Sequence, residues 1–461
     1  MKKPELTVDE VGEIFFDDEH VYRAIKDEFI EHAKEMLENG FLNELISKKL
    51  FPKTWITEKK IEGFSLVLEH QKIEYWNYPY EWSFDMLKDA ALTVLEVNKI
   101  ANKYGYEIKD GHVDNVVFNM NNPTYIDLGS FIKYDNNEKP NWTSYLDFYL
   151  TFYIPLKLWS KGFINLARNI ILGRKHFNEQ EFFRLNNPIL NVCLGNKITA
   201  SLHYFITRFR RTCLVSKSTV RKYTGSRVIF RNLALIINST FKGLYSTSNL
   251  ERRISKIKSP KEHSIWHDYH SNMDVSASDR FVRIRDIINE LKDIDVVLEV
   301  ASNQGKFASF ILENSAIQKV IATDYDSGAV NTMYHHNKGN EKLLTLLFDI
   351  VLTDGRMYRD IPIAQRISGD AVVALAVTHH LVLTQGIPLD YFFSKIKELS
   401  KKYVLVEFMP LGLYHGDMND IPELPQYYNF EWFKETFENH FNLILEEKLE
   451  SNRHLFLGSI K

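Results

Sequence analysis

The stretch that decides the fold is Asp295-Val-Val-Leu-Glu-Val-Ala-Ser-Asn-Gln-Gly305, which leads into an apolar run at 307–312. A β-rich run passes through a short polar turn into a segment of helical length. In such a turn the backbone N–H groups can approach a nucleotide-like ligand closely. Only Gly305 is present, while Ala301 and Asn303 stand where a pyrophosphate-binding loop would have further glycines. The turn therefore predicts a nucleotide-like ligand and argues against a pyrophosphate cradle.

Outward from this turn, short β-rich runs alternate with helix-length segments. The β-rich runs are DVVLEV (295–300), KVIATD (319–324), LLTLLFD (343–349), AVVALAV (371–377) and KYVLVEF (402–408). Regular alternation predicts a parallel, doubly wound α/β sheet. Two final runs, NLILEEKLE and HLFLGSI, are joined by a short polar turn and predict a hairpin at the sheet edge.

Acidic residues follow the second and third runs. Asp324 ends the run after the turn, where a carboxylate can accept hydrogen bonds from both hydroxyls of a ribose. Asp349 ends the third run. Either residue alone could equally be a helix cap or a surface charge. The order of strand, turn, helix, strand and acid favours a ligand site.

These motifs resemble, in order, those of class I S-adenosylmethionine-dependent methyltransferases, over roughly 266–461. EVASNQG is similar to the cofactor loop, ATDYDSGAV to the second-strand acidic motif and Phe348-Asp349 to the third-strand motif. The resemblance implies a Rossmann-like, seven-stranded sheet whose last strand is reversed. It also implies S-adenosyl-L-methionine as cofactor and a set of residues that bind it: Glu299, Ala301, Asn303, Gly305, Asp324, Tyr325 and Asp349. Within that set, Asp324 would hold the ribose and Asp349 would meet the adenine.

Candidate catalytic residues follow the fourth and fifth runs. His379 and His380 lie after the fourth, where residues should face the substrate, and a histidine there could accept a proton from a hydroxyl or amine. They could equally cap a helix and pack. Glu407 in the fifth run is a second candidate for contact with the acceptor. Trp266, Tyr269 and His270 would form a lid or pack between domains, and no set of zinc ligands is found for this site.

A second motif lies near the N-terminus. Asp110 and Asn115 are followed by Asp127 after a strand, a turn and a strand. Phosphoryl transfer needs a carboxylate near the acceptor hydroxyl and oxygen ligands for Mg²⁺. The segment resembles the catalytic loop and metal motif of protein-kinase-like phosphotransferases. The resemblance implies that Asp110 is the base and that Asn115 and Asp127 are ligands of a possible ATP–Mg²⁺ site.

The strands before this motif depart from the kinase pattern. No glycine-rich loop is present, with only Gly12 available. Lys26 resembles the phosphate-contacting lysine, with Glu31 or Glu35 as its partner, although Arg23 could serve instead. The N-terminal lobe therefore looks reduced, and a kinase-derived binding or scaffolding domain competes with an active phosphotransferase.

Charge and composition bound the remaining alternatives. The chain has 461 residues and a net charge of -3, with 44% hydrophobic residues, as in soluble globular proteins. Two cysteines, a charged start and no long apolar run predict a cytoplasmic protein without a transmembrane segment. The segment 208–261 carries 14 Lys and Arg against one acid, whereas 1–130 carries 15 against 25. This basic segment is a solvated connector, or it contacts an anionic partner or the inner membrane surface.

The sequence thus predicts a reduced, α+β kinase-like domain (1–206), a basic helical connector (207–259) and a class I methyltransferase domain (260–461). The preferred function is O-methylation of a hydroxyl or phosphate on a glycan or small-molecule acceptor. Three alternatives remain: a bifunctional kinase–methyltransferase, a non-catalytic nucleotide-sensing module, and a methyltransferase for nucleic acid, which is not favoured. The last predicts strongly salt-dependent binding.

Overall fold

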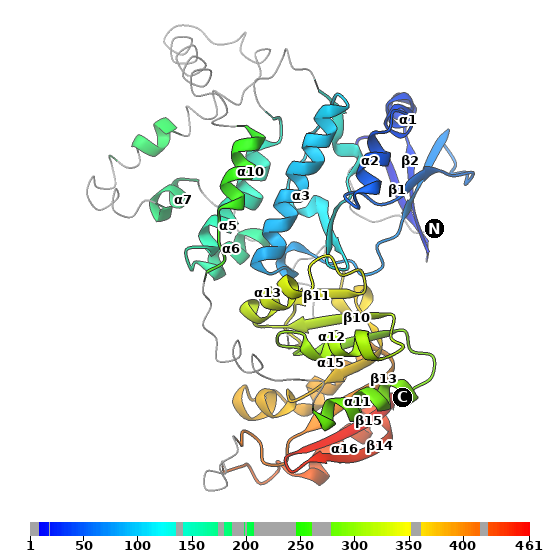
Figure 1. Cartoon of the computed structure of the whole chain (residues 1–461), viewed down its shortest axis with the longest axis vertical. Helices are drawn as coiled ribbons and strands as arrows, with labels where there is room; N and C mark the ends of the chain where they lie inside the picture. The colour runs from blue at the N-terminus through cyan, green and yellow to red at the C-terminus, as the bar shows by residue number, and fades with distance from the viewer. Residues whose placement is uncertain are drawn as a thin grey trace.

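The computed structural model describes residues 9–17, 19–134, 142–173, 179–186, 198, 201–206, 246–260, 278–351, 361–414 and 423–461. They form an N-terminal body of helices with a small sheet and a C-terminal body around a large sheet, stacked along the long axis (Figure 1). The expected lid residues Trp266, Tyr269 and His270 lie outside the described residues, as does most of the basic connector.

The N-terminal sheet is antiparallel, with the strand order β1-β2-β4-β3. Its strands are β1 (Gly12–Phe16), β2 (His20–Ile25), β3 (Thr54–Ile56) and β4 (Leu66–Gln71). Two helices follow β2, namely α1 (Ile30–Glu38) and α2 (Phe41–Ser47). Gly40 separates them with a φ of 90°, a conformation that glycine adopts without the usual steric cost.

A long buried helix, α3 (Phe84–Lys103), organises the rest of this body. It leads into β5 (Tyr106–Ile108), β6 (Val116–Asn119), β7 (Asn122–Tyr125) and β8 (Phe131–Lys133). β5 pairs with β8, and β6 with β7. The helices α4 (Tyr145–Phe148), α5 (Ile154–Trp159), α6 (Ile164–Ile171) and α7 (Glu179–Asn186) come next in the chain. α10 (Thr247–Ser255), the described end of the basic connector, lies against α3, where Lys88 Nζ donates to the Ile257 carbonyl at 2.9 Å.

The C-terminal sheet has the order β11-β10-β9-β12-β13-β15-β14. Its strands are β9 (Val296–Val300), β10 (Lys319–Asp324), β11 (Leu343–Leu347), β12 (Gly369–Ala374), β13 (Ser400–Phe408), β14 (Phe441–Glu450) and β15 (Arg453–Ile460). The first five run parallel, and β15 runs antiparallel to both β13 and β14. This mixed sheet matches the seven strands with a reversed last strand that the sequence predicted.

Helices cover both faces of this sheet. They are α11 (Asp279–Glu290), α12 (Lys306–Asn314), α13 (Ser327–His336), α14 (Ile363–Arg366), α15 (Leu389–Leu399) and α16 (Phe430–His440). Along β9, Val297 packs into one apolar cluster, and its neighbours Val296 and Leu298 pack into the other. This alternation is what a strand buried on both faces requires. The cluster that contains Val296 and Leu298 continues into the N-terminal body.

The N-terminal body covers the edge strand β11. The Asn121 side chain, in the β6–β7 turn, accepts from the Thr345 backbone N–H at 3.0 Å and donates to the Thr345 hydroxyl at 3.2 Å. An amide can do both because it carries a donor and an acceptor. A free strand edge invites pairing with another chain. Asn121 therefore occupies polar groups that β11 would otherwise expose.

Two further sets of contacts join the bodies. From α13, Tyr334 donates to Asp89 on α3 at 2.8 Å, and the Phe118 ring meets the Tyr334 ring edge-on at 5.7 Å. Near α14, Arg366 forms a bidentate ion pair with Glu81 at 2.6 and 3.0 Å. Both partners of that pair are almost fully buried. No helix among the described residues is long and apolar enough to cross a membrane.

Candidate functional site

The turn after β9 takes a conformation that usually calls for glycine. Ala301, Asn303 and Gly305 have φ values of 56°, 51° and 69°. Left-handed backbone costs a non-glycine residue roughly 1–2 kcal/mol, less for asparagine. Two of the three residues thus adopt the glycine conformation without being glycine. The turn therefore has three left-handed positions, of which one is a glycine.

Gly305 itself is required by close packing. A Cβ at this position would meet the side chain of Met333 on α13, with its Cγ at 2.6 Å. The absence of a side chain lets the start of α12 approach α13. The turn is thereby held against the helix that follows the next strand.

Glu299, at the end of β9, is a buried carboxyl group with 4% of its surface exposed. Its Oε2 has no hydrogen-bond partner among the described residues. Burial raises the pKa of Glu299 to about 8; Ser302 opposes this shift by a hydrogen bond, and the nearby Asp324 adds to it. A buried acceptor without a donor is uncommon. A cationic ligand that donates to Oε2 would supply the missing hydrogen bond and favour the ionised carboxylate.

Asp324, at the end of β10, fastens two loops together. Its Oδ2 accepts from the Asn303 backbone N–H at 2.8 Å, and its Oδ1 accepts from the Asp326 N–H at 2.9 Å. Burial raises the pKa of Asp324 to about 6, and these backbone hydrogen bonds oppose the shift. The neighbouring Tyr325 is half exposed. Asp349 is partly buried and accepts from the Val351 N–H at 3.0 Å. The sequence-predicted acids thus follow three adjacent parallel strands at the same edge of the sheet.

The two candidate histidines follow β12, which lies on the other side of β9. His379 is buried and His380 partly exposed, and their ring centroids are 3.9 Å apart. The preceding residue, Thr378, is buried and donates from its hydroxyl to the Glu407 carbonyl at 2.9 Å. The parallel strands place the histidines at the same edge as the turn after β9.

Glu407 is not placed for contact with an acceptor, which corrects the expectation from the sequence. The residue is fully buried, and both carboxylate oxygens accept from Arg280 on α11, at 2.5 and 2.6 Å. Arg453 donates to the same carboxylate at 3.1 Å. A charge that is enclosed by two arginines has no free surface to offer a substrate.

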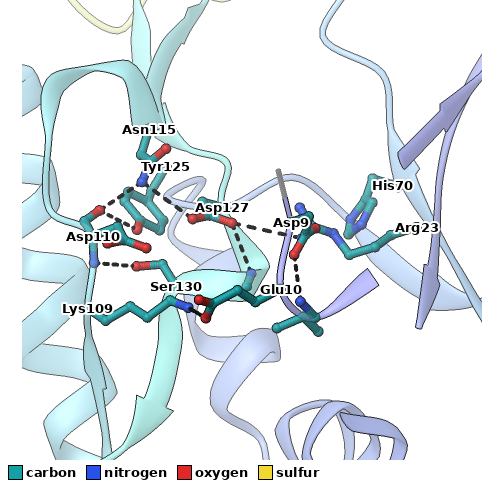
Figure 2. A network of polar contacts seen from close by, with 12 residues as sticks. Asp9, Glu10, Arg23, His70, Lys109, Asp110, Asn115, Tyr125, Asp127 and Ser130 are labelled. Atoms are coloured by element: carbon teal, nitrogen blue, oxygen red, sulfur yellow. Dashed lines mark hydrogen bonds and ion pairs between the residues drawn. The ribbon is translucent and has the colours of Figure 1, made fainter. Parts of the chain in front are cut away.

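The N-terminal candidates converge as well. Asn115 donates to the Asp110 carbonyl at 2.8 Å and lies 3.4 Å from Asp127 Oδ2 (Figure 2). The Asp127 carboxylate also accepts from the Gly129 N–H at 3.0 Å. Burial raises the pKa of Asp127; Arg23 opposes this shift, while Asp9 and Asp110 add to it. One amide and two aspartates, 17 residues apart at most, are therefore gathered in one place.

Lys26 is not part of this group, which corrects the first expectation from the sequence. Its amine donates to the backbone carbonyls of Asp9 and Glu10, at 3.4 and 2.8 Å. The alternative cation, Arg23, is buried, and its guanidinium lies 3.9 Å from Asp127 Oδ1. Figure 2 shows Arg23 reaching from the small sheet toward this acid.

The expected acidic partner on the following helix is not found either. Glu31 pairs with Lys34 at 3.9 Å and Glu35 with Lys133 at 2.8 Å, both at the surface. Arg23 instead forms an ion pair with Asp9, which precedes β1 (Figure 2). Asp9 could not be found from the sequence because its partner Arg23 is 14 positions away. The partners of Arg280, Arg366 and Asn121 are more than 100 positions away.

The strand order and the turn after β9 define a methyltransferase-like α/β fold with a mixed sheet. No family model matches the chain. A relative, nodulation protein NoeA of Rhizobium meliloti (strain 1021), is 26% identical over 367 residues, which are 75% of this chain and 71% of NoeA.

Solved structures overlap with about two-fifths of the chain. The PH0226 protein from Pyrococcus horikoshii OT3 has a TM-score of 0.34 and 15% identity, covering 43% of this chain and 100% of its own. A SAM-dependent methyltransferase from Aquifex aeolicus has a TM-score of 0.31 and 15% identity, covering 42% and 95%. The N-methyltransferase NodS from Bradyrhizobium japonicum WM9 has a TM-score of 0.28 and 10% identity, covering 39% and 92%. The kinase-like interpretation of the N-terminal body stays a prediction.

Proposed function

We propose that the chain is an S-adenosylmethionine-dependent methyltransferase acting on a hydroxyl or phosphate of a glycan or small molecule. The observation that carries the proposal is the buried Glu299 carboxyl beside the left-handed turn 301–305, because its Oε2 has no hydrogen-bond partner in the described part of the chain. Glu299 is on β9, and Asp324 ends the adjacent strand β10 of the same sheet. A cationic nucleoside could donate to the Glu299 carboxyl group and lie against the backbone of the turn.

The residues fit this cofactor by their chemistry. The Glu299 carboxyl is suited to the cationic amino-acid side, Asp324 to the ribose hydroxyls and Asp349 to the adenine amine. When bound, the cofactor supplies a methyl group on a positively charged sulfur. The chain holds the two reactants in alignment and excludes water, which is where most of the rate acceleration in such a displacement arises. His379 or His380 would take the proton that a hydroxyl acceptor loses.

Cofactor binding is the direct test. Calorimetric titration of S-adenosylmethionine into the full chain should show saturable binding, and Asp324→Asn should weaken it at least about tenfold, because a charged hydrogen bond contributes about 1.5–3 kcal/mol. Asp370→Asn is the matched control. Asp370 accepts from two backbone N–H groups at the opposite end of the sheet, at 2.9 and 3.0 Å. A folded protein that binds no S-adenosylmethionine would rule out the proposal.

A second candidate function is the binding or transfer of phosphate at the N-terminal body. It is supported by the convergence of Asp110, Asn115 and Asp127 beside the Arg23 guanidinium (Figure 2). These are the oxygen ligands and the cation that a magnesium nucleotide needs. ATP and Mg²⁺ would be held between the small sheet and the loop 110–115.

Titration of Mg²⁺–ATP separates an active nucleotide site from a scaffold. Binding that is abolished by Asp127→Asn, and retained in Asp114→Asn, would support the bifunctional alternative, because the Asp114 side chain is 71% exposed. No heat of binding from the folded wild-type protein would leave the N-terminal body as the structural cover of β11.

A further inference from the structure

We propose that Glu407 and Arg280 are positioning residues that fix the segment 376–380, and thereby the orientation of His379 and His380. The inference rests on the proposed methyl transfer, in which that segment faces the acceptor. It assigns to Glu407 an indirect role in place of contact with the acceptor.

Glu407 holds the segment at two points. Its Oε2 accepts from the Ala376 backbone N–H at 3.0 Å, and its carbonyl oxygen accepts from the Thr378 hydroxyl at 2.9 Å. Ala376 has a φ of 51°, a left-handed conformation that alanine adopts only when its surroundings impose it. The two hydrogen bonds lie on either side of Val377 and directly before His379. The direction in which the chain leaves β12 is therefore set from β13.

Arg280 in turn fixes Glu407. Its guanidinium donates to both oxygens of the Glu407 carboxylate and lies 4.4 Å from the centre of the Phe281 ring. The Phe281 ring packs 5.2 Å from the ring of Phe307 on α12, the helix that begins at the cofactor turn. Helix α11 thus contacts both the strand that holds the segment 376–380 and the helix that follows the cofactor turn.

Stability alone is a poor reason to bury this cluster. Three charges lie in a region where Glu407 is fully buried and Arg280 is 6% exposed. Replacing buried ion pairs by well-packed apolar residues is often neutral or stabilising, so such pairs are better suited to fixing one geometry. Arg453 is a second cation that donates to the same carboxylate, so Glu407 is paired with two arginines.

The test uses a variant that changes one hydrogen bond. Thr378→Val keeps the shape of a side chain that is 2% exposed and removes the hydroxyl donor to Glu407. Thr378→Ser restores that donor. Arg280→Lys keeps the charge and removes the bidentate geometry. The measurement is the NMR shift of the histidine ring ¹³Cε1 and ¹⁵N nuclei in the full chain, with signals assigned through His379→Gln and His380→Gln.

We expect Thr378→Val and Arg280→Lys to shift the ring signals of His379 and His380, and Thr378→Ser to return them to the wild-type values. Glu447→Gln is the matched control. This change breaks the bidentate pair between Glu447 and Arg283, which is on the same helix as Arg280. The Arg283–Glu447 pair makes no hydrogen bond or ion pair with the segment 376–380 among the described residues. Its histidine signals should match those of the wild type.

Histidine signals that stay unchanged in Thr378→Val and Arg280→Lys, while the melting temperature falls, would reduce the cluster to a structural role and overturn the proposal. Titration of S-adenosylmethionine in the same samples separates this failure from that of the proposed function. Thr378→Val should bind it within about twofold of the wild type, because its contact lies on the acceptor side. A wild-type chain that does not bind the cofactor fails the proposed function, whatever the histidines do.

Discussion

Arg366→Ala should lower the free energy of unfolding by about 3–5 kcal/mol, as expected when one partner of a buried ion pair is removed. The Arg366 side chain is 3% exposed and that of Glu81 is 5% exposed. Besides Glu81, the guanidinium donates to the carbonyls of Trp76 at 2.7 Å and Ile361 at 2.8 Å. Its removal would leave the Glu81 carboxylate buried without its cation. Urea denaturation of the full chain measures the effect.

Arg283→Ala is the control for this prediction, because it removes the same kind of bidentate pair from the surface. Arg283 is 37% exposed, and a pair of this kind contributes about 1 kcal/mol or less. A double variant with Arg366→Met and Glu81→Met should recover part of the loss, since no unpaired charge remains. If Arg366→Ala were no more destabilising than Arg283→Ala, the join between the two bodies would not depend on this pair.

Glu299→Gln should make the cofactor-free protein more stable than the wild type at alkaline pH. The pKa of Glu299 is about 8 in the folded chain against an ordinary value of 4.5, so the folded protein retains a proton that the unfolded chain releases. The wild type therefore loses stability as the pH rises from about 4.5 to 8, and the loss is complete above the folded pKa. Glutamine carries no such penalty. We expect a gain of roughly 4–5 kcal/mol at pH 8.5 and almost none near pH 4.5.

Thermal unfolding of Glu299→Gln and of the wild type across this pH range measures the difference. Asp324 acts in the same direction between pH 3.8 and about 6, so the comparison above pH 6 reports mainly on Glu299. Glu313→Gln on the exposed side of α12 is the control and should give no pH-dependent difference. A Glu299→Gln variant no more stable than the wild type at pH 8.5 would show that the carboxyl group is not held neutral by burial.

The same residue should make cofactor affinity depend on pH. A cationic ligand favours the ionised carboxylate, so binding near neutral pH should release protons and tighten as the pH rises toward 8. Calorimetry in two buffers of different ionisation enthalpy counts the protons released. In Glu299→Gln the proton release should fall and the affinity should weaken. The variant is thus predicted to gain stability and lose ligand binding, which is a common trade at functional sites.

The sequence predicted the C-terminal sheet well, because its strands are buried on both faces. Such strands read as continuous apolar runs, and five of them were found within a few residues of their bounds. The terminal hairpin was equally visible as two β-rich runs around a polar turn. The turn after β9 was located correctly, although its left-handed residues Ala301 and Asn303 do not announce their conformation.

The sequence could not show which polar residues are enclosed. Glu407 and Arg280 are 127 positions apart, and Glu81 and Arg366 are 285 apart, so nothing local indicates that either pair meets. Glu407 therefore looked like a residue available to a substrate. For the N-terminal cation, the position relative to β2 was the missed signal. Arg23 lies inside the strand and turns inward, whereas Lys26 lies just beyond its end.

The Asn121 contact with β11 has a consequence for how such a chain can change over evolutionary time. A gene that lost its front half would leave a C-terminal half whose edge strand β11 is open to other copies of itself. The front half can therefore be retained by selection even without a chemical activity of its own, because its removal would expose an unpaired strand edge that promotes aggregation.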